Sequence, residues 1–182
     1  MLIQAAYLLN PDREPIPDAA VWIQGDRILY AGERSHLPAE ADKEAEPMDL
    51  KDHVIAPGLV NAHCHLELTC LEGLAYPGSF VAWVREVLGK KNRLANPEQG
   101  ASIRRGVGLA LRGGTTAIGD HLSVTGDLET ALNCPLRGRV FLEILGVNPD
   151  VAEDLWAAAL SLLHAYENYP SRMTISLTPH SV

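Results

Sequence analysis

The sequence predicts an α/β fold built on a parallel sheet and preceded by a smaller β-rich region. From residue 53 onward, strand-like apolar runs alternate with helical patterns, while residues 1–56 carry short apolar runs separated by turn residues. Repeated strand–helix alternation is typical of parallel sheets, either open and doubly wound or closed into a barrel. With 182 residues and 47% hydrophobic composition, the chain has enough apolar material for a sizeable core.

Residues 1–56 contain one clear hairpin pattern. The segment AVWIQGDRILY (20–30) places two apolar runs on either side of Gln24, Gly25 and Asp26. A short turn with glycine between two such runs predicts a β-hairpin in which Gly25 takes a positive φ. The segment LPAEADKEAEP (37–47) is acidic and bounded by prolines, so we expect a solvated loop there.

Beyond residue 53 the pattern predicts four strands separated by helices. Helices are expected where apolar residues recur every three to four positions, and strands where β-branched and apolar runs follow glycine or proline. The expected strands are 54–63, 115–120, 139–145 and 173–178, and the expected helices are 80–94, 99–111, 128–132 and 150–166.

Charge and cysteine content exclude several classes of protein. The net charge of −8 arises from 15 basic and 23 acidic residues without a basic run, so we expect no nucleic-acid partner. Three irregularly spaced cysteines form neither a disulfide framework nor a CxxC zinc motif. The first residues lack a basic leader, and no apolar run reaches about 18 residues. We therefore expect a cytoplasmic protein with no signal peptide and no membrane partner.

Polar side chains follow or end each of the four predicted strands. His63 and His65 close the first strand, Asp120 and His121 the second, Glu143 lies in the third, and His180 follows the fourth. The carboxyl ends of parallel strands converge on one face of the sheet, which is where ligands bind in such folds. Residues far apart in the sequence are therefore expected to share one pocket.

The His63–His65 pair has the spacing of two metal ligands. Residues two apart on a strand point to the same side, so both imidazoles can reach one ion, whereas Cys64 points away and is expected to pack. Neutral imidazole binds zinc and iron, and a catalytic metal takes further ligands from elsewhere. The alternative is that two unrelated histidines stand together at a strand end.

Three segments carry a resemblance to a known family. PGLVNAHCHLELT (57–69), GGTTAIGD (113–120) and TPHSV (178–182) resemble, in order, segments of the cytosine deaminase, guanine deaminase and chlorohydrolase branch of the amidohydrolase superfamily. The resemblance implies the N-terminal half of a metal-dependent (β/α)8 TIM barrel over residues 57–182, truncated after strand 4. Residues 1–56 would then form part of the small β-sandwich that accompanies this barrel.

The segment EGLAYPGSFVAWVREVL (72–88) narrows the resemblance. Its Phe-x-x-Trp pattern, Phe80 and Trp83, is similar to aminodeoxyfutalosine deaminase-like members of that branch. The alternative is that these two aromatic residues simply pack in the core from one face of a helix.

The resemblance implies a hydrolytic deaminase whose substrate is a small molecule, an aminated purine-type nucleoside or heterocycle such as aminodeoxyfutalosine. One divalent metal ion, with zinc as the first expectation and iron as the alternative, would be bound by His63 and His65 and would activate water. His180, Trp83 and Glu67 are the expected substrate-binding residues. Asp120 and Glu143 are interpreted as structural, and His121 receives no role.

The sequence also departs from the family pattern. The remaining metal ligands and the acid/base residues are expected beyond Val182, so the catalytic residues are unknown. Three alternatives stay open. The chain could be a catalytically incomplete fragment, or an interaction half that pairs with a complementary C-terminal half or forms a homodimer. It could also be part of a chlorohydrolase-type enzyme of the same branch.

Overall fold

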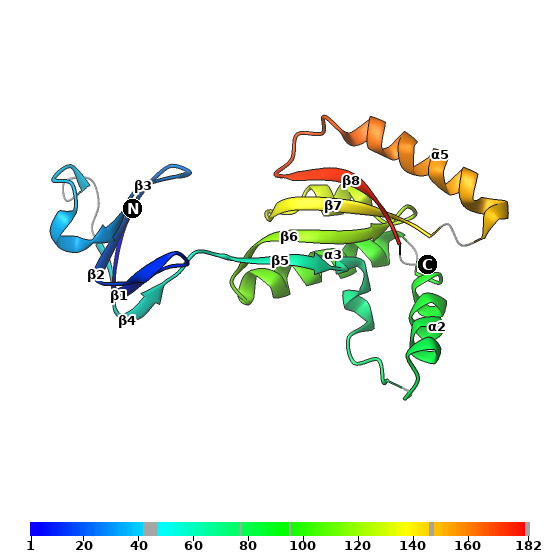
Figure 1. Cartoon of the computed structure of the whole chain (residues 1–182), viewed down its shortest axis with the longest axis horizontal. Coiled ribbons are helices and arrows are strands. Elements are labelled where there is room, and N and C mark those ends of the chain that lie inside the picture. Colours follow the sequence, from blue (N-terminus) through cyan, green and yellow to red (C-terminus); the bar gives the residue numbers. More distant parts are fainter. Residues whose placement is uncertain (42–46, 77, 95, 146–147, 181–182) are drawn as a thin grey trace. The chain divides into compact units, whose positions relative to one another are not determined.

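The computed structural model describes residues 1–41, 47–76, 78–94, 96–145 and 148–180. The chain divides into two compact units, Met1–Pro57 and Gly58–Val182. Each unit contains its own four-stranded sheet (Figure 1). The division falls directly before the segment that contains His63 and His65.

The first unit is a small mixed β-sheet. Its elements are β1 (Leu2–Asn10), β2 (Arg13–Gln24), β3 (Arg27–Glu33), the 3-10 helix η1 (Arg34–His36) and β4 (Pro47–Ile55). The strand order is β3-β2-β1-β4, and only the β1–β4 pair is parallel. Leu8, Ala19 and Val21 form a buried apolar cluster on this sheet.

The hairpin predicted at residues 20–30 is confirmed. The β2–β3 pairing continues to Gln24 and Arg27, which leaves Gly25 and Asp26 as a two-residue turn. Gly25 has a φ of +60°, a left-handed conformation that a residue without a Cβ adopts at no steric cost. Of the loop predicted at 37–47, residues 42–46 lie outside the described residues.

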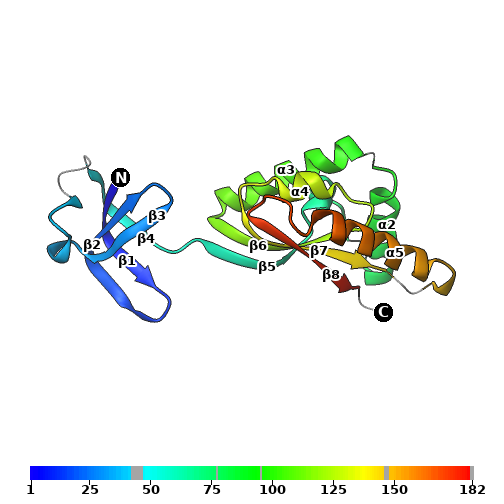
Figure 2. The same cartoon turned by 90° about the horizontal axis from the view of Figure 1, so that it is seen from above.

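The second unit is built on a parallel sheet, as the sequence predicted. Its strands are β5 (Leu59–Cys64), β6 (Thr115–Ser123), β7 (Arg137–Ile144) and β8 (Met173–Pro179), in the order β5-β6-β7-β8. All three strand pairs are parallel. The four carboxyl ends therefore lie at one edge of the sheet (Figures 1 and 2).

Helices connect these strands and cover the sheet. They are η2 (Leu66–Leu71), α2 (Phe80–Lys91), α3 (Asn96–Arg112), α4 (Leu128–Leu132) and α5 (Pro149–Tyr166). Ser79, Asp127 and Asn148 cap the starts of α2, α4 and α5 by accepting backbone N–H bonds. None of the helices in the described part of the chain has the length and apolarity that a membrane span requires.

Alternating residues of the strands divide between two faces of the sheet. Ile118 and Leu122 of β6 and Val140 and Leu142 of β7 are buried in the main apolar cluster, against residues of α3, α4 and α5. The intervening positions of β6 and β7 face the other way, because side chains of a strand alternate with a period of two. His121 and Glu143 belong to this second set.

The single strand predicted at 54–63 is wrong, because the structure has two strands there. β4 ends at Ile55 in the first sheet, and β5 begins at Leu59 in the second. Pro57 lacks the N–H that a strand ladder needs. A Cβ on Gly58 would lie 2.1 Å from Thr116 Oγ1, so only glycine allows the chain to pass this close to β6.

Candidate active site

The parallel register brings the polar strand-end residues together. Cys64 pairs with Asp120 across β5 and β6, Ser123 pairs with Glu143 across β6 and β7, and Glu143 pairs with Thr178 across β7 and β8. His63 and His65 at the end of β5 and His180 just after β8 are thereby placed near β6 and β7.

Three histidine rings form a cluster at this edge. The ring centroids of His63 and His65 are 5.1 Å apart, those of His63 and His121 are 4.1 Å apart, and those of His65 and His121 are 5.6 Å apart. His121 also stacks on Phe141 of β7, with centroids 5.0 Å apart. The sequence interpretation gave His121 no role, yet its ring lies beside both predicted metal ligands.

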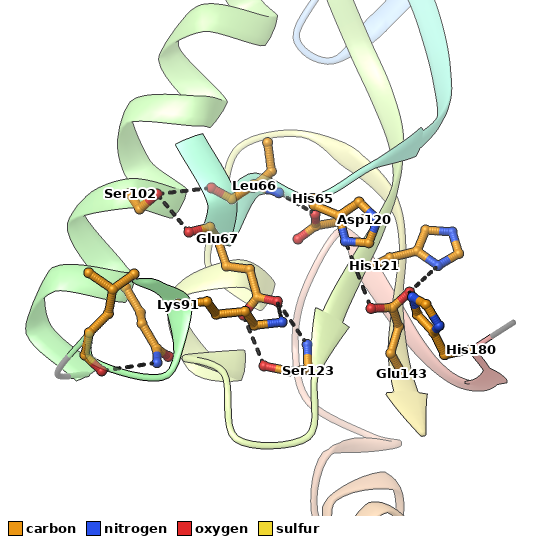
Figure 3. Close-up of polar contacts among 12 residues, drawn as sticks. His65, Leu66, Glu67, Lys91, Ser102, Asp120, His121, Ser123, Glu143 and His180 are labelled. Atoms are coloured by element: carbon orange, nitrogen blue, oxygen red, sulfur yellow. Dashed lines mark hydrogen bonds and ion pairs between the residues drawn. The ribbon is translucent and has the colours of Figure 1, made fainter. Parts of the chain in front are cut away.

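Glu143 lies at the centre of the histidines, as Figure 3 shows. Its carboxylate is buried, with 7% exposure, and its oxygens lie 3.8 Å from His65 Nδ1, 3.6 Å from His121 Nδ1 and 4.0 Å from His180 Nε2. These distances are longer than those of hydrogen bonds. Each contact becomes an ion pair only when its histidine is protonated. One carboxylate thus faces imidazoles from three different segments.

Two imidazoles of this cluster, those of His65 and His121, favour the neutral form. Burial is the main cause that lowers the pKa of His65, and the neighbouring His63 lowers it further, while Glu143 acts in the opposite direction. Burial is likewise the main cause that lowers the pKa of His121, and the neighbouring His63 is the second cause. Neutral imidazole is the form that binds a metal ion.

The residues at this edge include imidazole donors of the kind that zinc and iron bind. His63 and His65 come from one strand end, and His65 Nδ1 is buried without a hydrogen-bond partner among the described residues. Within the described ranges, no group of three or more histidine, cysteine, aspartate or glutamate side chains is arranged to hold a metal ion. A complete coordination shell would therefore need ligands outside these residues.

Asp120 supports the chain on both sides of His65, at Cys64 and at Leu66, where η2 begins. It is 1% exposed, and its Oδ1 accepts hydrogen bonds from Leu66 N at 2.8 Å and Cys64 Sγ at 3.7 Å. Its Oδ2 is buried without a partner among the described residues. Burial raises the pKa of Asp120 to about 6, and burial likewise raises the pKa of the Cys64 thiol to about 12.

Glu67 makes a second buried network beside the histidine cluster. It is 1% exposed, and its carboxylate accepts hydrogen bonds from Ser123 N at 3.2 Å and Ser123 Oγ at 3.0 Å. Lys91 Nζ of α2 lies 2.5 Å from Glu67 Oε1 (Figure 3). These contacts favour a structural role for Glu67 over the predicted contact with substrate.

A cavity of about 440 Å³ opens in front of the histidine cluster. Trp83 and His180, the other two predicted substrate-binding residues, both line it, whereas Glu67 does not. Its lining combines polar and apolar side chains. Its lining residues are His63, His65, Leu68, Phe80, Trp83, Val84, Val87, Leu88, Lys91, His121, Glu143, Leu145, Thr178, Pro179 and His180.

Sequence reasoning placed His121 at the shared strand-end face but gave it no role, and it missed Lys91. A role for His121 could have been considered from strand alternation, because Ile118 and Leu122 mark one face of β6 and put residue 121 on the other. Lys91 lies 24 positions after Glu67 in the sequence and meets it only in the folded chain. No local signal in the sequence therefore identifies this pair. The contact depends on how α2 packs.

Comparisons with known proteins were made by sequence and by fold. No protein-family model matches the chain. The chain is 32% identical over 173 residues to a 5-methylthioadenosine/S-adenosylhomocysteine deaminase of Halobacterium salinarum, covering 91% of this chain and 40% of the relative. It is 27% identical over 136 residues to an aminodeoxyfutalosine deaminase of Nitratiruptor sp., covering 72% and 34%.

Solved structures show the same likeness in fold. The Helicobacter pylori aminofutalosine deaminase in complex with methylthio-coformycin matches with a TM-score of 0.78 and 22% identity, covering 98% of this chain and 43% of that one. The atrazine chlorohydrolase of Arthrobacter aurescens complexed with zinc matches with a TM-score of 0.77 and 18% identity, covering 100% and 47%.

In sequence and fold, the chain is therefore similar to amidohydrolase-type deaminases, which confirms the resemblance predicted from the sequence. The similarity spans 34–40% of the length of the two relatives named above.

Proposed function

We propose that this chain contributes the strand-end part of the active site of a metal-dependent hydrolase. The proposed reaction is the deamination of an aminated purine-type nucleoside or related heterocycle, with aminodeoxyfutalosine among the candidates. The observation that carries the proposal is the cavity that joins the histidine–Glu143 cluster to an apolar, aromatic wall. A planar heterocycle fits such a wall while polar groups at the other side fix its orientation.

His63 and His65 are the proposed metal ligands. A bound zinc or iron ion would lower the pKa of a coordinated water and make hydroxide available near neutral pH. Glu143 faces Nδ1 of His65 at 3.8 Å, which leaves Nε2 of that ring for coordination. A carboxylate behind a ligating imidazole fixes its orientation and increases its basicity.

His180 and Trp83 are the proposed substrate-binding residues. Both line the cavity, and His180 Nε2 lies 4.0 Å from Glu143 Oε1, beside the other polar groups of the lining. The further metal ligands and the group that carries a proton to the leaving amine lie outside the described residues in this proposal. The likeness to an atrazine chlorohydrolase keeps chloride as the alternative leaving group.

Metal binding tests the first part of the proposal. Zinc is titrated into the 182-residue chain by calorimetry, and H63A and H65A are compared with H53A, which removes an exposed histidine of the first unit. We expect H63A and H65A each to weaken zinc binding at least tenfold and H53A to leave it unchanged. Equal zinc binding by all four proteins would overturn the assignment.

Product release tests the second part. Protein that carries this chain together with any further residues of its natural gene product is loaded with zinc or iron and incubated with aminodeoxyfutalosine, 5-methylthioadenosine or guanine. Release of ammonia supports deamination, and the preferred compound identifies the substrate. Chloride release from atrazine without ammonia release from any amine would replace deamination by the chlorohydrolase alternative.

A further inference from the structure

Helix α2 forms the apolar wall of the cavity with a single stripe of side chains. Phe80, Trp83, Val84, Val87 and Leu88 all line the cavity, and their spacing of three to four residues places them on one face of the helix. Phe80 and Trp83 lie next to each other, with ring centroids 6.1 Å apart. The position of α2 thus sets the width of the cavity.

The polar attachment of α2 is concentrated at its last residue. Among the described residues, the ion pair between Lys91 and Glu67 is the one polar side-chain contact that joins α2 to another element. The neighbouring Lys90 pairs instead with Glu86 on the same helix, at 3.2 Å. Val87, which is 8% exposed, is the only buried residue of α2. The helix therefore has little packing that could replace the ion pair.

Glu67 offers a fixed point for this attachment. Its carboxylate accepts two hydrogen bonds from Ser123 of β6, and its backbone carbonyl accepts one from Ser102 Oγ of α3 at 2.9 Å. The side chain of Lys91 is 12% exposed and that of Glu67 is 1% exposed, so water screens their attraction only weakly. The ion pair links the end of α2 to the centre of the sheet.

We propose that Glu67 and Lys91 are positioning residues that hold α2 as the specificity-determining wall of the cavity. Trp83 precedes Lys91 by two helical turns, about 12 Å along the axis. A small rotation at the anchored end is therefore enlarged at Trp83 and Phe80, where a heterocycle would pack. This role rests on the proposed function only in taking the cavity as the substrate site.

Hydrogen exchange measured by mass spectrometry on the 182-residue chain tests this role. The variants are K91M, which removes the charge, K91R, which restores it, and K90M, a matched control that removes the neighbouring solvent-exposed lysine. We expect the amides of α2 to exchange at least tenfold faster in K91M than in wild type, K91R to recover most of the protection, and K90M to change exchange less than twofold. Peptides from β7 are expected to keep their wild-type rates in all three variants.

A second variant and a second signal keep the test independent of folding defects. E67Q retains acceptor and donor atoms toward Ser123 but loses the negative charge, and we expect it to act on α2 as K91M does. In a W22F/W156F background, Trp83 is the remaining tryptophan, and its emission is expected to shift to the red in K91M and E67Q.

Three results would overturn the positioning role. They are α2 exchange in K91M equal to that in K90M, acceleration spread equally over α2 and β7, and Trp83 emission unchanged in both variants. Zinc binding through His63 and His65 is measured on the same proteins. If zinc binding fails while α2 responds as expected, the proposed function falls and the positioning of α2 stands.

Discussion

Two buried carboxylates lie at the same edge of the sheet in opposite circumstances. Glu67 and Asp120 are each 1% exposed. Glu67 is matched by a lysine ammonium and two donors of Ser123, whereas Asp120 has Leu66 N and the weak donor Cys64 Sγ on one oxygen and no partner for the other among the described residues. The two carboxylates are therefore equally buried, but the polar contacts that offset the cost of their burial differ greatly.

A buried carboxylic acid can have two different effects on the fold, and Glu67 and Asp120 show one each. A carboxylate that contacts a cation and several donors can attach one element to another, as Glu67 attaches α2 to β6. A poorly matched carboxylate is forced toward its protonated form, which is why burial raises the pKa of Asp120 to about 6. Asp120 consequently supports the backbone after His65 at a cost to stability that grows when it ionises.

Removal of the Glu67 carboxylate is expected to have the largest effect. E67A leaves the ammonium of Lys91 without its counter-ion, and breaking a buried pair on one side costs about 3–5 kcal/mol. Urea unfolding followed by tryptophan fluorescence in a W22F background measures the second unit, because Trp83 and Trp156 both belong to it. A loss in this range is the expected result.

The matched control for E67A is E72A. Glu72 pairs with Arg105, but both side chains are more than half exposed. An exposed ion pair contributes about 0–1 kcal/mol, so E72A is expected to lose less than 1 kcal/mol. Equal losses in E67A and E72A would contradict the distinction between a buried anchor and a surface pair.

Because Asp120 is buried with few donors, the free energy of unfolding is expected to depend on pH through this residue. Its folded pKa of about 6 exceeds the ordinary value of 3.8, so the folded state holds the proton more tightly and the associated stability is present below pH 3.8 and lost as pH rises through 6. D120N does not titrate. The unfolding free energy of D120N minus that of wild type should therefore rise by roughly 3 kcal/mol from pH 4 to pH 8.

Urea unfolding of both proteins across this pH range, again in the W22F background, checks that difference. The subtraction removes the contribution of the shared titrating groups that do not interact with Asp120; Glu67 and Glu143 do interact with it. A difference that stays constant or falls with rising pH would show that Asp120 ionises as readily in the folded state as in the unfolded chain.

The sequence predicted the outline of the site because the outline follows from regular geometry. Parallel strands bring their carboxyl ends together, and His63, His65, Glu143 and His180 accordingly line one cavity. The helix at 128–132 and the hairpin turn at Gly25 were also predictable, since both depend on residues adjacent in the chain. Local periodicity and turn chemistry were sufficient for these features.

The partners of Glu67 and Asp120 could not be predicted in the same way. Lys91 and Ser123 come from different elements, and their approach to Glu67 depends on how α2 packs and how β6 is aligned with β5. The break between β4 and β5 was missed for a related reason. Pro57 and Gly58 interrupt the apolar run at 54–63, but a Pro-Gly pair is also compatible with a bend within one strand, and only the pairing of the two parts with different sheets distinguishes these cases.

A smaller effect is expected at Ser123, the neutral partner of Glu67. S123A removes the hydroxyl that donates to Glu67 Oε2 at 3.0 Å and keeps the backbone N–H bond to Oε1. A hydrogen bond to a charged group contributes about 1.5–3 kcal/mol, and we expect a loss near the lower end because Lys91 continues to balance the carboxylate. A loss as large as that of E67A would show that the hydroxyl, and not the ion pair, is the main support of Glu67.

The smallest effect is expected at Cys64, the corresponding neighbour of Asp120. Its thiol lies 3.7 Å from Asp120 Oδ1, and a thiol is a weak donor, so C64A removes little polar stabilisation and one small apolar side chain. We expect a loss of about 1 kcal/mol, below that of S123A, in the same urea titration at pH 7. C64S is the informative companion, because its hydroxyl is a stronger donor. If C64S lowers the apparent pKa in the D120N difference curve, Asp120 lacks donors as proposed. If C64S leaves that curve unchanged, burial and the neighbouring carboxylates of Glu67 and Glu143 set the pKa of Asp120 without regard to the donor at residue 64.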